Sequence, residues 1–513
     1  MMNFRQYNNC TKIVIPRNVR LSTNDFSGAF ANMQNLQYLD IDKNIENQIN
    51  VISNGSWSGA VCYNCKKLIE SAVCGPNVTS MYYAYAYCTN LTTAVCGPNV
   101  TYMGYAYANC TNLTTAVCGD KVTNMGGAYQ DCTNLTTAVC GPNVTRMGGY
   151  KSGVYNGCTN LTTAVCGPNV IDISSTYCNC TNLTTAVCGD KVTNMKSAYS
   201  GCTNLTTAVC GPNVIDMSYA YPNCKNLTTA VCGPNVTDMG SAYIYCTNLT
   251  TAVCGDKVTN IAWSYLNCTN LTTAVCGPNV TRMSNAYEGC TNLTTAVCGD
   301  KVTDMVSAYS GCNKLTVAVC GPNVTDMSSA YLYCTNLTVA VCGPNVTTMS
   351  GYAHCTNLTT AVCGPNVTSM SYTYSGCTNL TTAVCGDKVT NMSSVYKDCI
   401  NLTTAVCGPN VTDMGSAYSG CTNIQGNSYF YSHNINVVRS CFYSRNTSNM
   451  LNIYVQNNTN TMNTCLISNT YSLTGSAITW TNDSANNRYY NTSANIYIYP
   501  VANVYQAKID NDD

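Results

Sequence analysis

Residues 88–107 read CTNLTTAVCGPNVTYMGYAY, and close copies of this stretch follow one another over residues 65–421. From Cys88 onwards the first cysteine of each copy recurs every 22 residues, with one step of 26 residues after Cys132 and one of 21 residues after Cys334. A fixed period in this range is typical of stacked repeat proteins, because one short unit cannot bury its apolar side chains alone. The sequence therefore predicts a solenoid.

Each copy contains a predicted strand, which in this copy is LTTAVC, residues 91–96. Alternate side chains of a strand point to opposite faces. Ala94 and Cys96 are therefore expected to face the core, and Thr93 and Val95 to face the solvent.

Two further segments complete the predicted coil. Gly97-Pro-Asn99 predicts a turn, since proline fixes φ and both glycine and asparagine tolerate positive φ. Some copies have Gly-Asp-Lys instead, as at Gly119-Asp-Lys121. Residues 100–107 then predict a bent or 3₁₀-like return segment with one apolar side.

The order of residues within the copies resembles the BspA-type leucine-rich repeat, and the resemblance covers residues 65–421. It implies a β-rich, right-handed leucine-rich-repeat solenoid with short strands, 3₁₀ or irregular return segments, and a cap at each end. Cys96, Met103 and Tyr107 stand where the family usually has Ile or Leu, Ile, and Phe. These departures imply a core that is smaller, softer and richer in thiols than is usual.

The chain divides into three predicted domains. Residues 1–64 form an N-terminal cap with degenerate repeats, in which 13–16 and 39–41 keep the strand pattern. Residues 65–421 form the array, with a small loop at 148–154. Residues 422–513 form degenerate last coils and a β-rich C-terminal cap or attachment module, because 450–455, 477–480 and 494–499 alternate apolar and polar residues. This tail resembles the ends of repeat proteins carried by gut bacteriophages.

Composition excludes several classes of function. The chain has 23 basic and 23 acidic residues and a formal net charge of zero, whereas nucleic-acid binders carry a basic excess. No stretch of about 18 apolar residues occurs, so no transmembrane segment is expected. The N-terminus lacks the apolar run of a signal peptide, so export is not evident from the sequence.

Cysteine is abundant and follows the repeat. The predicted thiol ladder has two columns, which begin with Cys88, Cys110 and Cys132 and with Cys96, Cys118 and Cys140. We expect buried free thiols that act as small apolar side chains. The alternative is a row of disulfides between coils, but strands lie about 4.8 Å apart, whereas a disulfide needs Cβ atoms about 3.8 Å apart.

Candidates for chemistry are few. Cys62-x-x-Cys65 has zinc-like spacing, but no second pair with matching spacing follows, and the two histidines, His354 and His433, lie far apart in the sequence. No nucleophile and base stand in a recognisable arrangement, and no phosphate-binding loop precedes a helix. We therefore predict a protein that is not an enzyme, with no cofactor and no metal.

Two surfaces remain as candidate binding sites. One is the outward column that contains Thr93 and Val95, whose alternative is a solvated face chosen for strand propensity. The other is the variable side of the return segment, rich in Tyr, Ser, Gly and Asn, which are adaptable contact residues. The alternative to a binding role is that the sequence of this second surface varies because its positions are loosely constrained. The aromatic members of this second surface are Tyr83, Tyr105, Tyr219 and Trp263.

We predict a non-enzymatic structural or adhesion protein. The first hypothesis is a bacteriophage virion component, a fibre or decoration protein that uses the solenoid as spacer and binding surface. The alternative is a BspA-like cell-surface adhesin of a gut bacterium or protist. The expected partners are other virion or surface proteins and a host-surface glycan or protein, with the chain in a homo-oligomer or multi-copy assembly and without nucleic acid.

Overall fold

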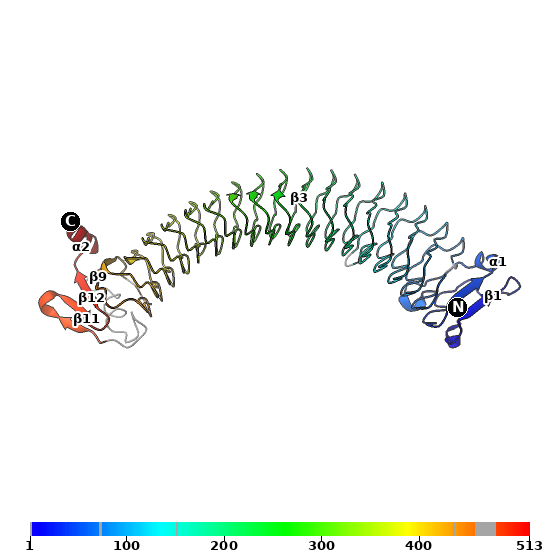
Figure 1. Ribbon diagram of the computed structural model, residues 1–513, viewed down its shortest axis with the longest axis horizontal. Coiled ribbons are helices and arrows are strands. Elements are labelled where there is room, and N and C mark those ends of the chain that lie inside the picture. Colours follow the sequence, from blue (N-terminus) through cyan, green and yellow to red (C-terminus); the bar gives the residue numbers. More distant parts are fainter. Residues whose placement is uncertain are drawn as a thin grey trace. The chain divides into compact units, whose positions relative to one another are not determined.

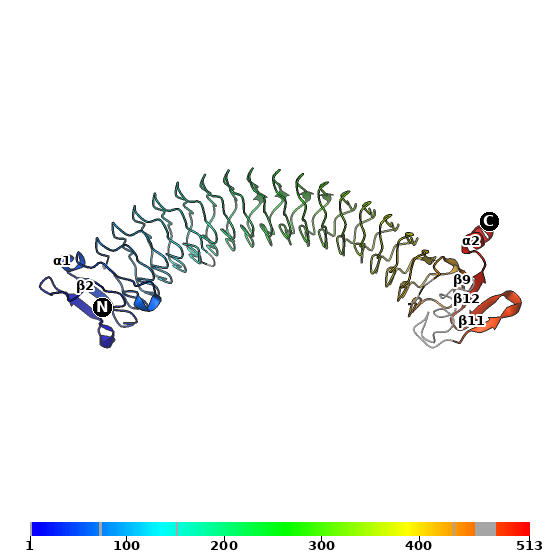
Figure 2. The same cartoon turned by 180° about the vertical axis from the view of Figure 1, so that it is seen from behind.

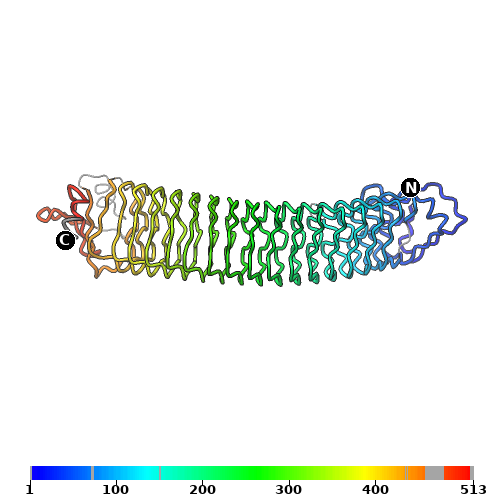
Figure 3. Tube along the Cα trace, turned by 90° about the horizontal axis from the view of Figure 1, so that it is seen from above, coloured from blue at the N-terminus to red at the C-terminus, as the bar shows by residue number. Residues whose placement is uncertain are grey.

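The computed structural model describes residues 3–70, 74–149, 152–433, 435, 437–456 and 479–512. The chain forms two compact units, Met1–Val258 and Thr259–Asp513. Within each unit, successive coils of the array lie side by side (Figure 1), and in the view from above their traces run parallel (Figure 3). The domain boundaries after residues 64 and 421 stay a prediction.

Regular secondary structure is sparse, since most of each coil is built from turns and single β-bridges. In the first unit the elements are η1 (Arg5–Tyr7), β1 (Lys12–Ile15), β2 (Tyr38–Ile41), α1 (Lys43–Glu46), η2 (Trp57–Gly59), β3 (Thr229–Ala230) and β4 (Thr251–Ala252). In the second unit they are β5 (Thr273–Val275), β6 (Thr295–Val297), β7 (Val406–Cys407), β8 (Gly426–Phe430), β9 (Leu451–Gln456), β10 (Thr481–Asp483), η4 (Ser484–Asn486), β11 (Arg488–Asn491), β12 (Ile496–Val501) and α2 (Val504–Asp512).

The six-residue strand predicted for each coil is too long. Within this segment most coils pair in parallel through a single bridge, such as Thr115 with Thr137, and β3 to β6 reach only two or three residues. A second parallel bridge, such as Asn124 with Arg146, joins the return segments. A tyrosine hydroxyl also reaches the backbone of the strand segment, although in β7 Val406 is part of the strand and bonds to the Tyr418 hydroxyl as well. Tyr129 donates its hydroxyl to the carbonyl oxygen of Val117 and accepts the Val117 N–H at 2.9 Å, so these backbone groups are not left for a neighbouring coil. In β5 the corresponding hydroxyl of Tyr287 lies 3.5 Å from the Val275 carbonyl oxygen, and there the strand includes the valine.

That tyrosine belongs to a buried column at the centre of the coils. In the first unit Tyr107 stacks on Tyr129 with ring centroids 5.6 Å apart and 5° between the ring planes. In the second unit Tyr287 and Tyr309 stack at 5.5 Å and 4°. These rings have no solvent exposure. Tyrosine therefore takes the place of the family's phenylalanine and adds a hydroxyl that anchors the outward strand segment.

The turn predicted at Gly97-Pro-Asn99 is present, but its glycine and asparagine are not there to allow a positive φ. Neither Gly97 nor Asn99 has a positive φ. Instead, a Cβ on Gly97 would lie 2.8 Å from the Cys74 Sγ of the preceding coil, and the Gly97 N–H donates to that sulfur at 3.1 Å. Glycine is needed here because the thiol of the neighbouring coil approaches the backbone closely.

The N-terminal region begins the parallel stacking. β1 pairs with β2 in parallel, so the strands predicted at 13–16 and 39–41 are present. Phe26, Phe30 and Ile45 are buried beside them. Of the loop predicted at 148–154, residues 150 and 151 lie outside the described residues.

The C-terminal region continues the sheet of the last coil and then reverses it. The sheet order is β10-β11-β12-β9-β8-β7, in which β7, β8, β9 and β12 run parallel, β11 is antiparallel to β12, and β10 is antiparallel to β11. β9, β12 and β11 are labelled in Figure 2. Predicted strands at 450–455 and 494–499 correspond to β9 and β12. The prediction for 477–480 lies partly outside the described residues. The reversal ends the parallel stack with an antiparallel pair, whose edge strand β10 is only three residues long, and so short an edge strand limits further strand addition.

A buried arginine joins this region to the last coils. Arg445 is 7% exposed, and its guanidinium donates to the carbonyl oxygens of Ile424 at 3.3 Å, Asn449 at 2.6 Å and Asn495 at 3.1 Å, and to that of Ala494. Burial lowers the pKa of Arg445 to about 10, so the group is still a cation at neutral pH. The charge is thus balanced by carbonyl dipoles.

We predict that Arg445→Met separates β11 and β12 from the array. The substitution leaves several buried carbonyl groups without a donor, and each is expected to cost about 1–3 kcal/mol locally. Hydrogen exchange of β12 amides should accelerate by at least two orders of magnitude. Arg439→Met, at an exposed arginine of the same region, is the control and should leave this exchange unchanged. Equal hydrogen-exchange rates of the β12 amides in both variants would contradict the role assigned to Arg445.

Candidate functional site

The first cysteine column lies in the core. Cys88, Cys110 and Cys132 have no solvent exposure. The Cys110 thiol donates to the carbonyl oxygen of Tyr85 at 3.1 Å, and the Cys132 thiol to that of Tyr107 at 3.1 Å. Burial raises the pKa of all three thiols well above the ordinary range. These thiols are therefore held protonated as hydrogen-bond donors.

The second cysteine column lies nearer the surface. Cys96, Cys118 and Cys140 are half-buried, and burial raises the pKa of Cys118 and of Cys140 to about 11. Each sulfur lies close to the glycine of the next coil, as Cys118 does to Gly141. Every cysteine among the described residues is a free thiol. The column thus acts in packing between coils.

The outward strand column is placed on the surface. Thr93 is exposed and Val95 half-buried, and the valine becomes more exposed in later coils, as at Val253 and Val275. The backbone N–H of Val95 donates to the Tyr107 hydroxyl at 2.8 Å. A binding role for this column stays a prediction.

The aromatic candidates share one unusual backbone conformation. Tyr83, Tyr105, Tyr219 and Trp263 all have a left-handed backbone, with φ between 52° and 62°. The N–H of Tyr105 donates to the carbonyl oxygen of Gly126 in the next coil, and the N–H of Tyr83 to that of Gly104, both at 3.0 Å. This conformation costs roughly 1–2 kcal/mol for a residue with a Cβ. The stacking of the coils imposes it, whichever side chain occupies the position.

Within the first unit the structure brings Tyr83 and Tyr105 together and leaves Tyr219 apart from them. The rings of Tyr83 and Tyr105 stack at 4.8 Å on adjacent coils. Tyr219 is 48% exposed and has serines on both sides in its column. Trp263 belongs to the second unit. The column therefore carries isolated exposed rings and one stacked pair.

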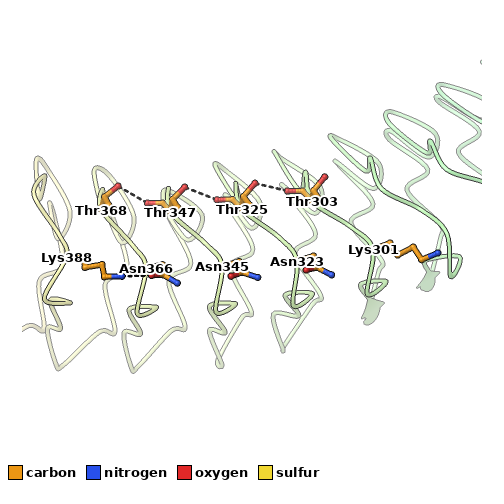
Figure 4. Close-up of a pocket in the computed structure, with 9 residues that line it drawn as sticks. All are labelled: Lys301, Thr303, Asn323, Thr325, Asn345, Thr347, Asn366, Thr368 and Lys388. Carbon is orange, nitrogen blue, oxygen red and sulfur yellow. Dashed lines mark hydrogen bonds between the residues drawn. The ribbon is translucent and has the colours of Figure 1, made fainter.

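A groove that the sequence reasoning missed runs across five coils of the second unit (Figure 4). Its volume is about 680 Å³. Threonines form one wall and asparagines the other, and a lysine stands at each end (Figure 4). The lining residues are Lys301, Thr303, Asn323, Thr325, Asn345, Thr347, Asn366, Thr368 and Lys388.

Hydrogen bonds between coils fix both walls. The Thr347 hydroxyl donates to the carbonyl oxygen of Thr325 at 3.3 Å, and the Asn345 side-chain amide donates to that of Pro322 at 2.9 Å. The Lys388 ammonium donates to Asn366 Oδ1 at 2.6 Å and closes one end. Among the described residues, no donor engages Oδ1 of Asn323 or Asn345. These oxygens, the second N–H of each amide and the threonine lone pairs are left for a ligand.

A second groove of the same construction lies in the first unit. Its volume is about 510 Å³, and Lys191 and Lys257 stand at its ends. Each groove thus spans the coils between two Gly-Asp-Lys copies. The walls between them are Thr193, Asn213, Ile215, Asn235 and Thr237. The alternation of Gly-Pro-Asn with Gly-Asp-Lys was the sequence signal for these grooves.

The chemistry available in the grooves is that of binding. Amides, hydroxyls and the lysines at the two ends line both grooves, with Ile215 as an apolar member of the second. The described residues contain no group of three His, Cys, Asp or Glu side chains placed to hold a metal ion. In the part of the chain that the structure describes, neither helix combines the length and apolar character needed to cross a membrane.

Comparison with known proteins identifies the repeat. The family described as BspA type Leucine rich repeat region matches over residues 79–206, 128–241, 196–316, 283–403 and 350–474. No curated protein matches the sequence.

Two solved structures are similar to this chain. A leucine-rich repeat protein from Bacteroides ovatus is 15% identical, and the match covers 68% of this chain and 80% of that one with a TM-score of 0.41. A leucine rich cell surface protein from Faecalibacterium prausnitzii is 16% identical, with 82% and 87% covered and a TM-score of 0.28. Since the family match spans well over half of the sequence, the chain belongs to the BspA-type leucine-rich repeat family.

Proposed function

We propose that this protein is a non-enzymatic adhesin that binds an extended, uncharged polysaccharide along the asparagine–threonine grooves. The observation that carries the proposal is the groove between Lys301 and Lys388, in which an amide and a hydroxyl recur once in each coil. Coils of a parallel stack repeat about every 4.8 Å, close to the length of one sugar ring. A polymer of sugar rings would therefore meet the same pair of groups at each step.

The charge of the groove favours a neutral ligand. The Lys388 ammonium already donates to Asn366, and the ammonium of Lys301 donates to Asn279 at 2.6 Å, away from the groove. The free groups are amide and hydroxyl groups, which exchange hydrogen bonds with sugar hydroxyls. Each such bond is weak, and affinity comes from repetition along the polymer.

The double variant Asn323→Ala, Asn345→Ala tests the groove. We expect its affinity for a bound neutral polysaccharide to fall about tenfold, because several hydrogen bonds are lost together. Affinity electrophoresis of the full chain in gels containing dextran, mannan or xylan measures the change.

The matched control removes two asparagines from neighbouring coils outside the groove. Asn357 donates to Asn336 Oδ1 at 3.4 Å on another face, so Asn336→Ala, Asn357→Ala should bind as the wild type does. Equal loss in both double variants would contradict the groove assignment. Absence of binding to every polysaccharide would contradict the proposed function.

We propose the surface of a bacterial cell as the place of action, which membership of the BspA-type family supports. A bacteriophage virion is the second candidate, favoured by the resemblance of residues 422–513 to the ends of phage-borne repeat proteins. Mass spectrometry of purified particles and of cell envelopes, searched for peptides from 422–513, separates the two. Recovery in envelopes alone supports the first, and recovery in particles supports the second.

A further inference from the structure

The single 21-residue step of the array creates a local hollow in the second unit. The coil that follows Cys334 reads Met349-Ser-Gly-Tyr352, whereas neighbouring coils have one more residue between the methionine and the buried tyrosine. The missing residue is the left-handed one that carries the variable side chain. Ser329 and Tyr372 occupy this position in the coils on either side, with φ of 55° and 58°. The column therefore has a gap between them.

The gap forms a hollow of about 470 Å³. Tyr372, which is 56% exposed, lines one side of it. Tyr333 and His354 line it as well, stacked with ring centroids 4.7 Å apart and 9° between the ring planes. The hydroxyl-bearing side chains that line it are Ser329, Thr348, Ser350, Ser369, Ser371 and Ser375.

The shortened coil leaves one backbone acceptor open. In neighbouring coils the left-handed residue donates its N–H to the next coil, as Ser329 does to the carbonyl oxygen of Ser350 at 3.0 Å and Tyr372 to that of Ser393 at 3.0 Å. The coil of Tyr352 has no such residue. Consequently the Ser371 carbonyl oxygen accepts no hydrogen bond from the described part of the chain. The side-chain hydroxyls of Ser329 and Ser350 likewise have no partner among the described residues.

A second carbonyl oxygen of the short coil lacks its usual backbone donor and contacts a side-chain hydroxyl instead. The carbonyl oxygen of Met327 accepts from the Ala330 N–H at 3.1 Å, and the short coil lacks the equivalent donor for Met349. The next coil has Thr373 where most copies have alanine, and its buried hydroxyl contacts the Met349 carbonyl oxygen. Thr373 thus supplies a donor for the Met349 carbonyl oxygen, whereas the carbonyl oxygen of the half-buried Ser371 is left without one among the described residues.

We propose that this hollow binds a single uncharged pyranose ring, either free or at the end of a glycan. The apolar face of the ring lies against Tyr372, a contact of the kind that aromatic side chains favour. One ring hydroxyl donates to the Ser371 carbonyl oxygen, and others exchange hydrogen bonds with Ser329 and Ser350. None of the lining residues is a carboxylate, lysine or arginine, which suits a neutral ligand. This site is separate from the grooves and does not depend on the proposed polysaccharide binding.

Saturation-transfer NMR on the full chain tests the proposal, with the methyl pyranosides of glucose, galactose, mannose and N-acetylglucosamine as probes. We expect at least one to bind, and Tyr372→Ala to weaken it about 3- to 10-fold through loss of the aromatic contact. Tyr219→Ala is the matched control, because Tyr219 has the same backbone conformation and similar exposure but no gap beside it. It should bind as the wild type does.

A second variant restores the missing residue. Inserting one alanine between Gly351 and Tyr352 gives the coil its usual length and fills the gap, so binding should be lost while the circular dichroism spectrum is unchanged. The groove variant Asn323→Ala, Asn345→Ala should retain binding of the methyl pyranoside, which separates the two sites. Failure of all four probes to bind, or equal loss in Tyr372→Ala and Tyr219→Ala, would overturn the proposal.

Discussion

Raising the pH from 8 to 10 in the presence of a reducing agent is expected to unfold the array. Burial raises the pKa of Cys246 and of Cys290 to about 12, whereas an unfolded thiol titrates near 8.5. Because the folded pKa is the higher one, stability is complete below pH 8.5 and declines as the pH rises towards 12. Each fully buried thiol then costs about 2 kcal/mol at pH 10.

The stability lost by all the buried thiols of one cysteine column determines whether the array unfolds. Five such thiols in one cooperative segment remove about 10 kcal/mol, comparable with the whole stability of an ordinary domain. Urea denaturation at pH 8, 9 and 10, followed by circular dichroism, measures the decline. Cys246→Ser removes one titrating group and should reduce the pH dependence by about 2 kcal/mol. A urea midpoint that does not change between pH 8 and pH 10 would contradict protonated, buried thiols.

Removing one ring from the buried tyrosine column is expected to have one of the largest effects of any single substitution. Tyr129 lies between Tyr107 and Tyr155, with centroid distances of 5.6 and 5.8 Å, and has no solvent exposure. Tyr129→Ala opens a cavity and should cost about 3–5 kcal/mol. Tyr129→Phe keeps the ring but leaves the Val117 N–H and carbonyl without the hydroxyl, which should cost about 1–3 kcal/mol.

The order of these variants separates packing from hydrogen bonding. Tyr219→Ala, at an exposed tyrosine, is the control and should stay within about 0.5 kcal/mol of the wild type. Urea denaturation gives the free energy of unfolding, and hydrogen exchange shows whether the loss is centred on the coils around Tyr129. If Tyr129→Phe were as stable as the wild type, the hydroxyl would not anchor the strand segment as described.

Features of the coil that are set by residues within a single repeat could be predicted from the sequence. The inward direction of Ala94 and Cys96 follows from strand alternation, and the stacking follows from the period. The left-handed positions could not be predicted, because Tyr105, Trp263 and Ser307 all occupy them without a glycine signal. Contacts with the next coil impose that conformation.

The candidate sites depend on several coils, which is why single-copy reasoning missed them. The groove needs asparagines and threonines from successive copies to align, and only the stacked structure shows Asn345 beside Thr347 facing the same space. The strand was predicted too long because the extent of backbone pairing between neighbouring coils cannot be seen in one copy. The 21-residue step was a sequence signal for the hollow at Tyr372. Its consequence could be recognised only once the structure showed which residue of the coil is missing.

The most direct test of the proposed function is binding of the full chain to immobilised neutral and anionic polysaccharides at 0.1 and 0.5 M salt. Hydrogen bonding through amides and hydroxyls predicts binding to neutral polymers that persists at the higher salt, because little charge is involved. Binding confined to anionic polymers and lost at 0.5 M salt would assign recognition to the lysines. That result would contradict the assignment of the asparagine–threonine grooves as the adhesive surface.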